Sequence, residues 1–342
     1  MTEPTRRRPP VIADVARVAG VSVPTVSRVI TGSTPVSAAK RAQVMAAIDE
    51  LGYRPNAAAR ALVSGRHSMI SVLAGNTTRY GYAATLQGVE EAARAAGYLV
   101  VITVVESDEQ AVVDSVVDLV LGQAVAGVVV LEFDAAGIAA ARALPESVPV
   151  VTVSATRPGE HDRPHADLDD RSAAAEAVDY LLGMGHRTVH HVSIPSSGPE
   201  VGRTLGWRDA LAAAGAPEPE PMAPGWHPAA GYEAGVLLAQ DPAVTAVLAG
   251  NDQLAIGLMR AFMDAGRSVP QDVSVVGFDD EPFAAMWSPP LTTVAQDFVG
   301  LGRRAFGMLM DLARTGRSTA RSTAIPPLVL RGSAAPPPAR QD

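Results

Sequence analysis

The chain has 342 residues, a formal net charge of −8 and no cysteine. This length is too great for one small hydrophobic core and predicts two or three lobes, and the lack of cysteine excludes disulfides, thiolate metal sites and a cysteine nucleophile. No signal-peptide pattern opens the sequence, and no stretch approaches the ~18 apolar residues of a membrane span, so we expect a cytoplasmic protein without a membrane partner.

Charge is distributed unevenly along the chain. Residues 1–68 hold ten Lys and Arg against four Asp and Glu, a net charge of +6, whereas residues 69–342 carry −14. A basic segment attached to an acidic body is typical of a protein that meets phosphate groups with one end only. The N-terminal part is therefore the candidate nucleic-acid-binding part.

A disordered tail is expected over residues 1–10, which are rich in proline and arginine; an arm that enters the DNA minor groove is the less favoured alternative. Residues 12–31 then have helix-turn-helix spacing. Ala16 is small enough for a second helix to cross it, Gly20 tolerates the positive φ of the turn, and Val26 fills the wedge between the helices. The expected helices are 12–19, 23–30 and 38–50, within a DNA-binding domain over residues 11–54.

The next segment, residues 55–67, is predicted to be a hinge helix. Residues 55–65 carry no apolar face of their own, so they would fold only when bound. From Met69 onwards, β-branched runs alternate with alanine-rich amphipathic stretches, which predicts an α/β fold of parallel sheets covered by helices on both faces. The expected strands are 70–74, 99–105, 126–131, 148–153, 188–194, 246–250 and 274–278. The expected helices are 82–97, 109–123, 170–185, 201–214, 229–239 and 253–265.

The motifs of this sequence resemble those of the lactose-repressor (LacI/GalR) family of bacterial transcription regulators. The family strings G-V-S-x-x-T-V-S-R-V, V-S, L-G-Y-x-P-N and A-x-x-L occur at residues 20–29, 36–37, 51–56 and 59–62. Further similarity runs to about residue 333. The resemblance implies a sensor of two parallel-sheet lobes, similar to periplasmic sugar-binding proteins, behind the helix-turn-helix headpiece and hinge helix. It implies an N-terminal lobe of residues 68–166 with 296–326, a C-terminal lobe of 167–295 with 327–333, and a disordered tail of 334–342.

The resemblance places the second short helix in the major groove of operator DNA. Val23 and Pro24 match the variable specificity positions of the family, although Pro24 equally suits the first turn of a helix. Arg28 can donate two hydrogen bonds to guanine O6 and N7. Val11 stands where relatives keep a capping threonine, which puts one phosphate contact in doubt. Hydroxyl groups suited to phosphate contacts belong to Thr25, Ser27, Thr31 and Ser37.

The hinge string P-N-A-A-A-R-A-L resembles the minor-groove helix of the family and contributes Asn56, Ala59 and Leu62. Small residues such as Ala59 let two such helices pack across a dyad, and Leu62 is expected to wedge into the central base step. The alternative for Leu62 is an ordinary core position. A paired hinge implies a homodimer on a pseudo-palindromic operator.

The resemblance also implies a small-molecule site between the lobes. An arginine, carboxylates and amides that face an aromatic plane suit a sugar, because polar groups pair with its hydroxyls while an indole stacks on its ring. N-capping is the alternative for Asn251 and Asp279, and core packing is the alternative for Trp226. The candidate residues are Asn76, Ser154, Arg203, Trp226, Asn251, Asp279, Gln296 and Phe298.

Two differences from relatives narrow the expected effector. Ser197 stands where purine-sensing relatives carry a second arginine, and Ser154 stands where the galactoside-sensing prototype has an aspartate. We therefore expect a repressor of carbohydrate-utilisation genes that a galactoside or glucoside releases from its operator. A global or corepressed regulator, controlled by a protein partner or another small molecule, is the alternative. Because a G-x-S-x-G elbow, a P-loop and metal-ligand spacing are missing, we expect no enzyme activity, cofactor or metal.

Overall fold

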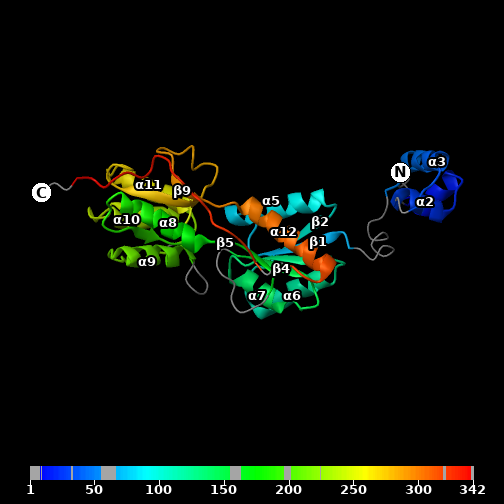
Figure 1. The fold of residues 1–342 in the computed structure, drawn as a ribbon, viewed down its shortest axis with the longest axis horizontal. Helices are drawn as coiled ribbons and strands as arrows, with labels where there is room; N and C mark the ends of the chain where they lie inside the picture. Colours follow the sequence, from blue (N-terminus) through cyan, green and yellow to red (C-terminus); the bar gives the residue numbers. More distant parts are fainter. Residues whose placement is uncertain are drawn as a thin grey trace, which may run out of the picture. The chain divides into compact units, whose positions relative to one another are not determined.

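The computed structural model describes residues 8, 10–31, 34–54, 67–154, 163–195, 202–223, 225–318 and 321–339. The chain divides into two compact units, Met1–Ser68 (unit 1) and Met69–Asp342 (unit 2), which are described separately (Figure 1). Within the described ranges, no helix is both long and apolar enough to cross a membrane.

Unit 1 contains the three helices expected from the sequence. They are α1 (Ile12–Val18), α2 (Val23–Thr31) and α3 (Ala38–Leu51). Gly20 in the turn and Gly52 after α3 have φ values of 63° and 59°, a region that glycine enters without steric cost. Ala16 and Val26 lie in the buried core between the helices, as the helix-turn-helix spacing predicts.

Unit 2 begins with the N-lobe, whose strands are β1 (Met69–Ala74), β2 (Leu99–Val104), β3 (Val128–Leu131), β4 (Val150–Ser154), β5 (His165–Leu168) and β10 (Arg321–Ala324). They form one parallel sheet in the order β10-β5-β4-β3-β1-β2. One face is covered by α5 (Tyr80–Ala95) and α12 (Phe298–Thr315), and the other by α6 (Gln110–Leu121) and α7 (Ala135–Ala143).

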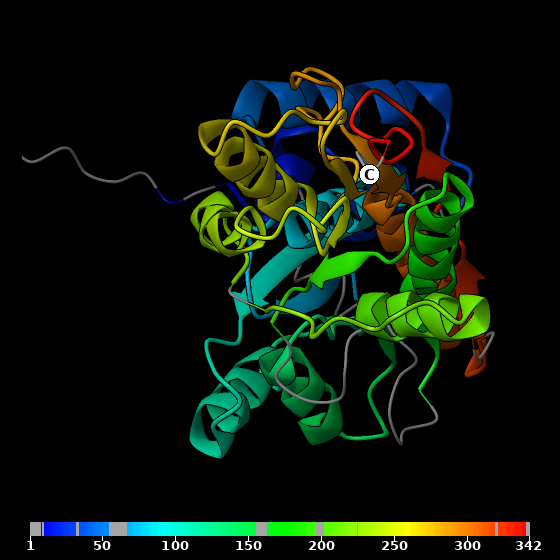
Figure 2. The same cartoon turned by 90° about the vertical axis from the view of Figure 1, so that its left-hand side faces the viewer.

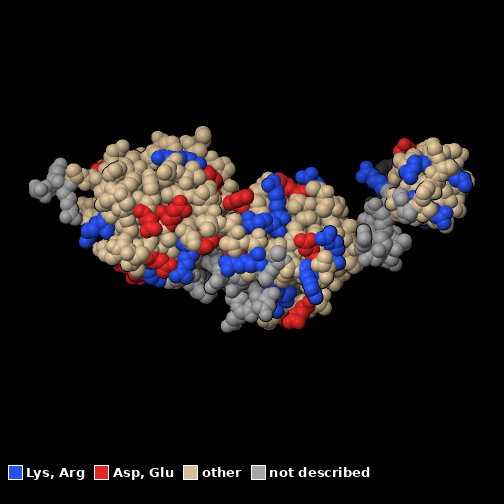
Figure 3. All heavy atoms as spheres, in the orientation of Figure 1, with Lys and Arg blue, Asp and Glu red and all other residues tan. Residues whose placement is uncertain are grey.

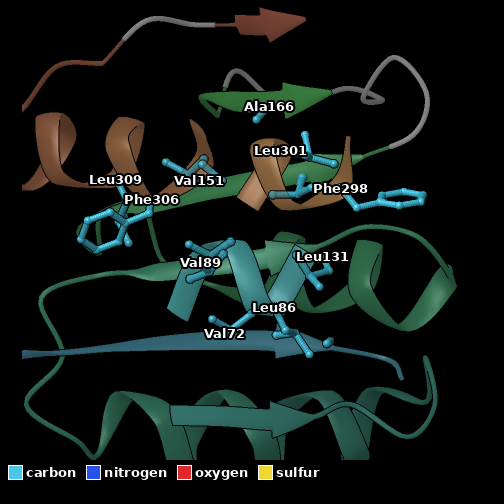
Figure 4. Packing of buried hydrophobic residues seen from close by; sticks show 14 of the residues in the cluster. Val72, Leu86, Val89, Leu131, Val151, Ala166, Phe298, Leu301, Phe306 and Leu309 are labelled. Atoms are coloured by element: carbon cyan, nitrogen blue, oxygen red, sulfur yellow. The ribbon is translucent and has the colours of Figure 1, made fainter. Parts of the chain in front are cut away.

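The N-lobe core explains why a late segment of the chain returns to this sheet. Figure 4 shows Leu301 and Leu309 of α12 on either side of Val151 of β4, with Val89 of α5 between this group and Val72 of β1. All five side chains are fully buried. The apolar stripe of α12 therefore completes a hydrophobic layer that α5 alone leaves open.

The C-lobe has the strands β6 (His190–Val192), β7 (Ala246–Ala249), β8 (Ser274–Asp279), β9 (Thr292–Ala295) and β11 (Leu328–Val329). Their order is β11-β9-β8-β7-β6, and all pairs are parallel except β11 with β9. Helices α8 (Asp170–Gly183) and α9 (Gly202–Ala214) cover one face, and α10 (Pro228–Leu238) and α11 (Asp252–Asp264) cover the other. The predicted parallel sheets are confirmed, with one antiparallel edge strand added in the C-lobe.

The structure shows defined contacts just beyond two of the expected boundaries. The first passage between the lobes was placed near residue 166, but β5 pairs with β10 as far as Leu168, so Asp167 and Leu168 belong to the N-lobe. A disordered tail was expected from residue 334, yet Ala335 donates its backbone N–H to Ser274 Oγ over 3.0 Å. Figure 2 shows the red C-terminal segment lying on the C-lobe. Hydrogen bonds to β8 satisfy the backbone of this segment, and such bonds do not require a periodic pattern of apolar residues in the sequence.

Candidate functional site

The DNA-reading candidates on α2 lie on one exposed face. Val23, Pro24, Arg28 and Thr31 are exposed and Thr25 and Ser27 are half-buried, whereas Val26 and Val29 point into the core. Val23 keeps 40% of its surface exposed, which is high for an apolar side chain in a helix of a packed bundle. On the visible face of unit 1, Figure 3 shows mainly Lys and Arg among the charged side chains. Unit 1 therefore presents basic side chains that can meet a polyanion.

Several expected hydroxyl groups already have local partners. Thr25 Oγ1 and Ser22 Oγ share a hydrogen bond of 2.9 Å, and the Thr31 hydroxyl donates to the Ser27 carbonyl over 2.9 Å. Ser37 occupies the N-cap position of α3 but makes no capping bond with its side chain. Thr31 and Ser37 are exposed and Thr25 is half-buried, so a phosphate could still bind to the remaining positions of these hydroxyl groups.

Helix α1 begins without a capping hydroxyl at Val11. The backbone N–H of Val11 instead donates to Asp14 Oδ2 over 3.0 Å. This bond from the backbone of Val11, ahead of a weaker contribution from Arg17, lowers the pKa of Asp14. An acidic side chain in the first turn thus closes the helix start that the missing threonine leaves open. The hinge candidates Asn56, Ala59 and Leu62, and also Ser197, lie outside the described residues.

In unit 2, Arg203 on α9 is the centre of a buried polar cluster and keeps 4% of its surface exposed. Its Nε donates to Asp170 Oδ2 over 2.8 Å, its Nη1 donates to the Gly250 carbonyl, and its Nη2 lies 3.1 Å from Asp279 Oδ1. The guanidinium plane stacks on the Phe278 ring, 4.0 Å from its centroid. Carboxylates, a carbonyl and an aromatic face thus surround the guanidinium.

Gln296 and Asp279 complete what we call the Arg203 cluster, which consists of Arg203, Asp170, Asp279 and Gln296. Gln296 follows β9 and donates its Nε2 to Asp170 Oδ1 over 2.6 Å. Asp279 ends β8 with a φ of 110°, and Asp280 follows with a φ of 53°. Two successive non-glycine residues with positive φ are uncommon and point to a constrained functional position.

Asn251 and Trp226 are held together beside the cluster. Asn251 caps α11 by accepting the Leu254 N–H at Oδ1 over 2.7 Å, and its Nδ2 donates to the Trp226 carbonyl over 3.1 Å. Asn251 therefore has the capping role that was its alternative interpretation. Trp226 is half-buried, and the Arg79 guanidinium from the N-lobe lies 4.4 Å from the centroid of its indole. This contact brings the two lobes together at the indole.

The remaining candidates lie at strand ends of the N-lobe or against its core. Asn76 accepts the Thr78 N–H over 2.8 Å and the Arg79 N–H over 2.9 Å, so it organises the turn before α5. Ser154 ends β4 and is buried. Phe298 packs edge-on against Tyr80 at a ring-centroid distance of 5.9 Å. Asn76 therefore helps to fix the position of Arg79, and Phe298 helps to fix the position of Tyr80.

Sequence reasoning missed two residues of this region, Asp170 and Arg79, whereas Asp252 directly follows the predicted Asn251 and Tyr80 was a candidate for the rim of the site. Asp252 accepts the Thr293 hydroxyl at Oδ1 over 2.6 Å and the Glu281 N–H at Oδ2 over 2.7 Å. A Cβ on Gly277 would lie 2.2 Å from Asp252 Oδ1, so this glycine makes the approach possible. For Asp170, the signal in the sequence was the acidic run D-L-D-D, which ends at this residue.

Burial among like charges perturbs the acids of this region. Burial raises the pKa of Asp252 to about 7, and the charge of Glu281 adds to the effect. Burial also raises the pKa of Asp279, against the opposing influence of Arg203. The pKa of Tyr80 is raised by burial and then by the charge of Asp279. Acidic groups of the C-lobe therefore act on a tyrosine of the N-lobe.

Comparison with known proteins gives matches over both units. Residues 11–56 match the family of bacterial regulatory proteins, lacI family, and residues 178–334 match the periplasmic binding protein-like domain. The HTH-type transcriptional regulator CelR of Thermobifida fusca is 33% identical over 338 residues, which cover 92% of this chain and 94% of CelR.

Two solved structures extend this similarity to the fold. A lac repressor dimer bound to operator and the anti-inducer ONPF has a TM-score of 0.86 and 28% identity, over 96% of this chain and 100% of the repressor chain. A CelR–cellobiose complex has a TM-score of 0.69 and 29% identity, over 95% of this chain and 100% of the CelR chain. These matches confirm the predicted α/β fold with its helix-turn-helix headpiece, and the chain belongs to the lacI family of bacterial regulatory proteins, which are DNA-binding transcriptional regulators.

Proposed function

We propose that this chain is a repressor of carbohydrate-utilisation genes that binds a pseudo-palindromic operator through unit 1 and responds to a sugar bound by unit 2. The observation that carries the DNA-binding half is the exposed face of α2, with Val23, Pro24 and Arg28 outward and Val26 buried. Such a face fits the major groove, where Arg28 can donate two hydrogen bonds to guanine. This function requires neither catalysis nor a cofactor.

The Arg203 cluster supports the sugar-binding half. It gathers buried hydrogen-bonding side chains beside the indole of Trp226, and Tyr80 approaches from the other lobe. Polar groups next to an aromatic plane are the usual chemistry of sugar recognition. The similar CelR structure contains cellobiose, a glucoside disaccharide. A glucoside or galactoside is therefore the effector class that we propose.

Exposed apolar surfaces on both lobes support a homodimer. Strand β2 is an edge of the N-lobe sheet, and its Leu99 keeps 66% of its surface exposed. On the C-lobe, a hollow of about 950 Å³ is lined by Met263, Met286 and Trp287, of which Met286 is 81% exposed. Apolar edge strands and patches of this kind are normally covered by a partner. A second copy of the chain would cover both.

The proposal is tested with the full-length protein and a site selected from random-sequence DNA. Gel shifts should give much tighter binding to the full palindrome than to a half-site, because one headpiece offers few contacts. Cellobiose or lactose should release the full site. Equal affinity for half-site and full site would contradict the dimeric mode. Operator binding that no glucoside or galactoside changes would contradict the effector class.

A further inference from the structure

We propose that the Arg203 cluster selects a ligand that donates hydrogen bonds and carries no negative charge, so that it rejects phosphorylated and acidic sugars. The inference rests on the proposed function, because it assumes that this cluster holds the effector. It concerns the charge of the ligand, which similarity to a family of sugar-responsive regulators leaves open.

Each nitrogen of the arginine already has a partner in the protein. Its Nε and Nη2 face Asp170 and Asp279 at 2.8 and 3.1 Å, its Nη1 is taken by the Gly250 carbonyl, and its plane lies on Phe278. A phosphate could take the place at Nε or Nη2 only by displacing one of the two carboxylates. The displaced carboxylate would then remain buried without a partner, which is strongly unfavourable.

Hydrogen-bond acceptors exceed donors at the same place. Asp279 Oδ1 is buried and held by its ion pair with Arg203 Nη2 at 3.1 Å, and Gln296 Oε1 is buried and accepts no hydrogen bond from a described residue. The residues keep 9% and 6% of their surface exposed. A hydroxyl or ammonium group can satisfy both oxygens, whereas a phosphate or carboxylate oxygen cannot donate to either.

The charges around the cluster act in the same direction. The Asp252 carboxylate accepts the backbone N–H of Glu281, and both residues are buried. Arg79 of the N-lobe has its guanidinium over the Trp226 ring, 4.4 Å from the ring centroid. With Asp170 and Asp279 already balancing Arg203, the remaining field favours a neutral or positively charged ligand.

The test uses three matched probes on one scaffold: cellobiose, the β-1,4-linked glucosamine dimer and cellobiose 6-phosphate. Calorimetry with the full-length protein should show binding of the first two and at least about tenfold weaker binding of the phosphate, since a buried unpaired charge is costly. The Asp279→Asn variant should narrow this discrimination, because it removes one negative charge and frees Arg203 Nη2. The matched control is Asp264→Asn, an exposed carboxylate of the C-lobe paired with Arg260.

The outcomes separate this inference from the proposed function. Operator release by cellobiose 6-phosphate at concentrations equal to or below those of cellobiose overturns the inference and leaves a sugar-controlled repressor standing. Unchanged discrimination in a folded Asp279→Asn protein also overturns it. If none of the probes binds while the operator is still bound, the effector assignment and the inference both fail and the DNA-binding half stands.

Discussion

Gln296 and Asp170 are 126 positions apart in sequence, yet the Gln296 side-chain amide donates to Asp170 Oδ1 over 2.6 Å. Asp170 begins α8 just after the chain leaves the N-lobe, and Gln296 precedes α12 just before the chain returns to it. One hydrogen bond therefore joins two of the three connections between the lobes. Asp170 also holds Arg203, so the connections and the Arg203 cluster form one polar network.

Loss of the hydrogen bond between Gln296 and Asp170 should lower the stability of unit 2. We expect Gln296→Leu to lower the free energy of unfolding by ~1–3 kcal/mol, since a buried hydrogen bond to a charged group is removed. Urea unfolding followed by circular dichroism measures this change. The control is Gln110→Leu, which removes an exposed bond of 2.7 Å to Asp114 and should have little effect. Equal effects of the two substitutions would mean that the Gln296 bond contributes nothing beyond a surface contact.

The raised pKa of Asp252 predicts a pH-dependent stability difference. Its folded pKa, about 7, lies above the ordinary value of 3.8, so the folded state binds more protons between these values and stability falls as pH rises through this window. Asp252→Asn does not titrate. The variant should therefore gain stability relative to the native chain between pH 5 and pH 8, on the order of 2–4 kcal/mol.

Paired urea titrations at pH 5, 6, 7 and 8 measure this difference, and the contribution of His191 cancels because both proteins contain it. Burial lowers the pKa of His191 to about 4, so its own effect has the opposite sign. The control Asp264→Asn should give a difference that stays flat over this range, because Arg260 lowers the pKa of Asp264. A flat difference for Asp252→Asn as well would show that Asp252 is ionised at pH 5.

The sequence predicted most helices and strands of the two lobes, but it did not predict β5 and β10, which lie next to the passages between the lobes. Strands β1, β3 and β4 are continuous apolar runs, which are recognisable because both of their faces are buried. Strands β5 and β10 read H-A-D-L and R-S-T-A, and their pairing includes a double hydrogen bond from Arg321 to Asp167. A charged residue at such a position resembles a loop until its partner is known.

The residues of the candidate site also divide into those that local motifs predict and those that only the folded structure reveals. Arg203, Asp279 and Gln296 were expected from the motifs and do meet in the structure. Asp170 was missed because its role depends on Arg203, 33 positions away. Arg79 was missed because its contact with Trp226 exists only where the two lobes face each other. Local patterns carry no information on such long-range pairs.

Arg28 should determine one base pair of the operator. We expect Arg28→Ala to lose ~1–3 kcal/mol of binding and to relax specificity at that position, because a paired contact to guanine is removed. Binding to operator variants, measured by fluorescence anisotropy at several salt concentrations, tests this. Arg60→Ala, in the segment outside the described residues, should instead reduce mainly the salt dependence. A uniform loss across all sequences for Arg28→Ala would assign Arg28 to a phosphate.

Leu62 should act only on the complete operator. If it wedges into the central base step, Leu62→Ala weakens binding to the full site, since the bent duplex and its extra contacts are lost. Thermal stability and sugar binding of the variant should stay native, as should its weak binding to a half-site. Full-site affinity that equals that of the native chain would remove Leu62 from the DNA interface.

The last prediction concerns the direction of the sugar response. The hinge of residues 55–65 is expected to fold only when the two N-lobes of a dimer hold both copies close together. A sugar that links Arg203 and Asp279 of the C-lobe to Tyr80 of the N-lobe favours one arrangement of the lobes, and we expect that arrangement to move the N-lobes apart. The sugar shifts the population only if it binds this form more tightly.

Linkage then fixes the size of the reciprocal effect. Operator DNA should weaken sugar binding by the same factor by which the sugar weakens DNA binding. Titration of cellobiose into a labelled operator complex, together with calorimetry of cellobiose binding in the presence and absence of operator, gives both factors. Unequal factors would show that another equilibrium, such as dimer dissociation, takes part. A sugar that tightens the operator complex would reverse the sign and make this chain a corepressed regulator, because the sugar would then favour the arrangement in which the hinge is folded.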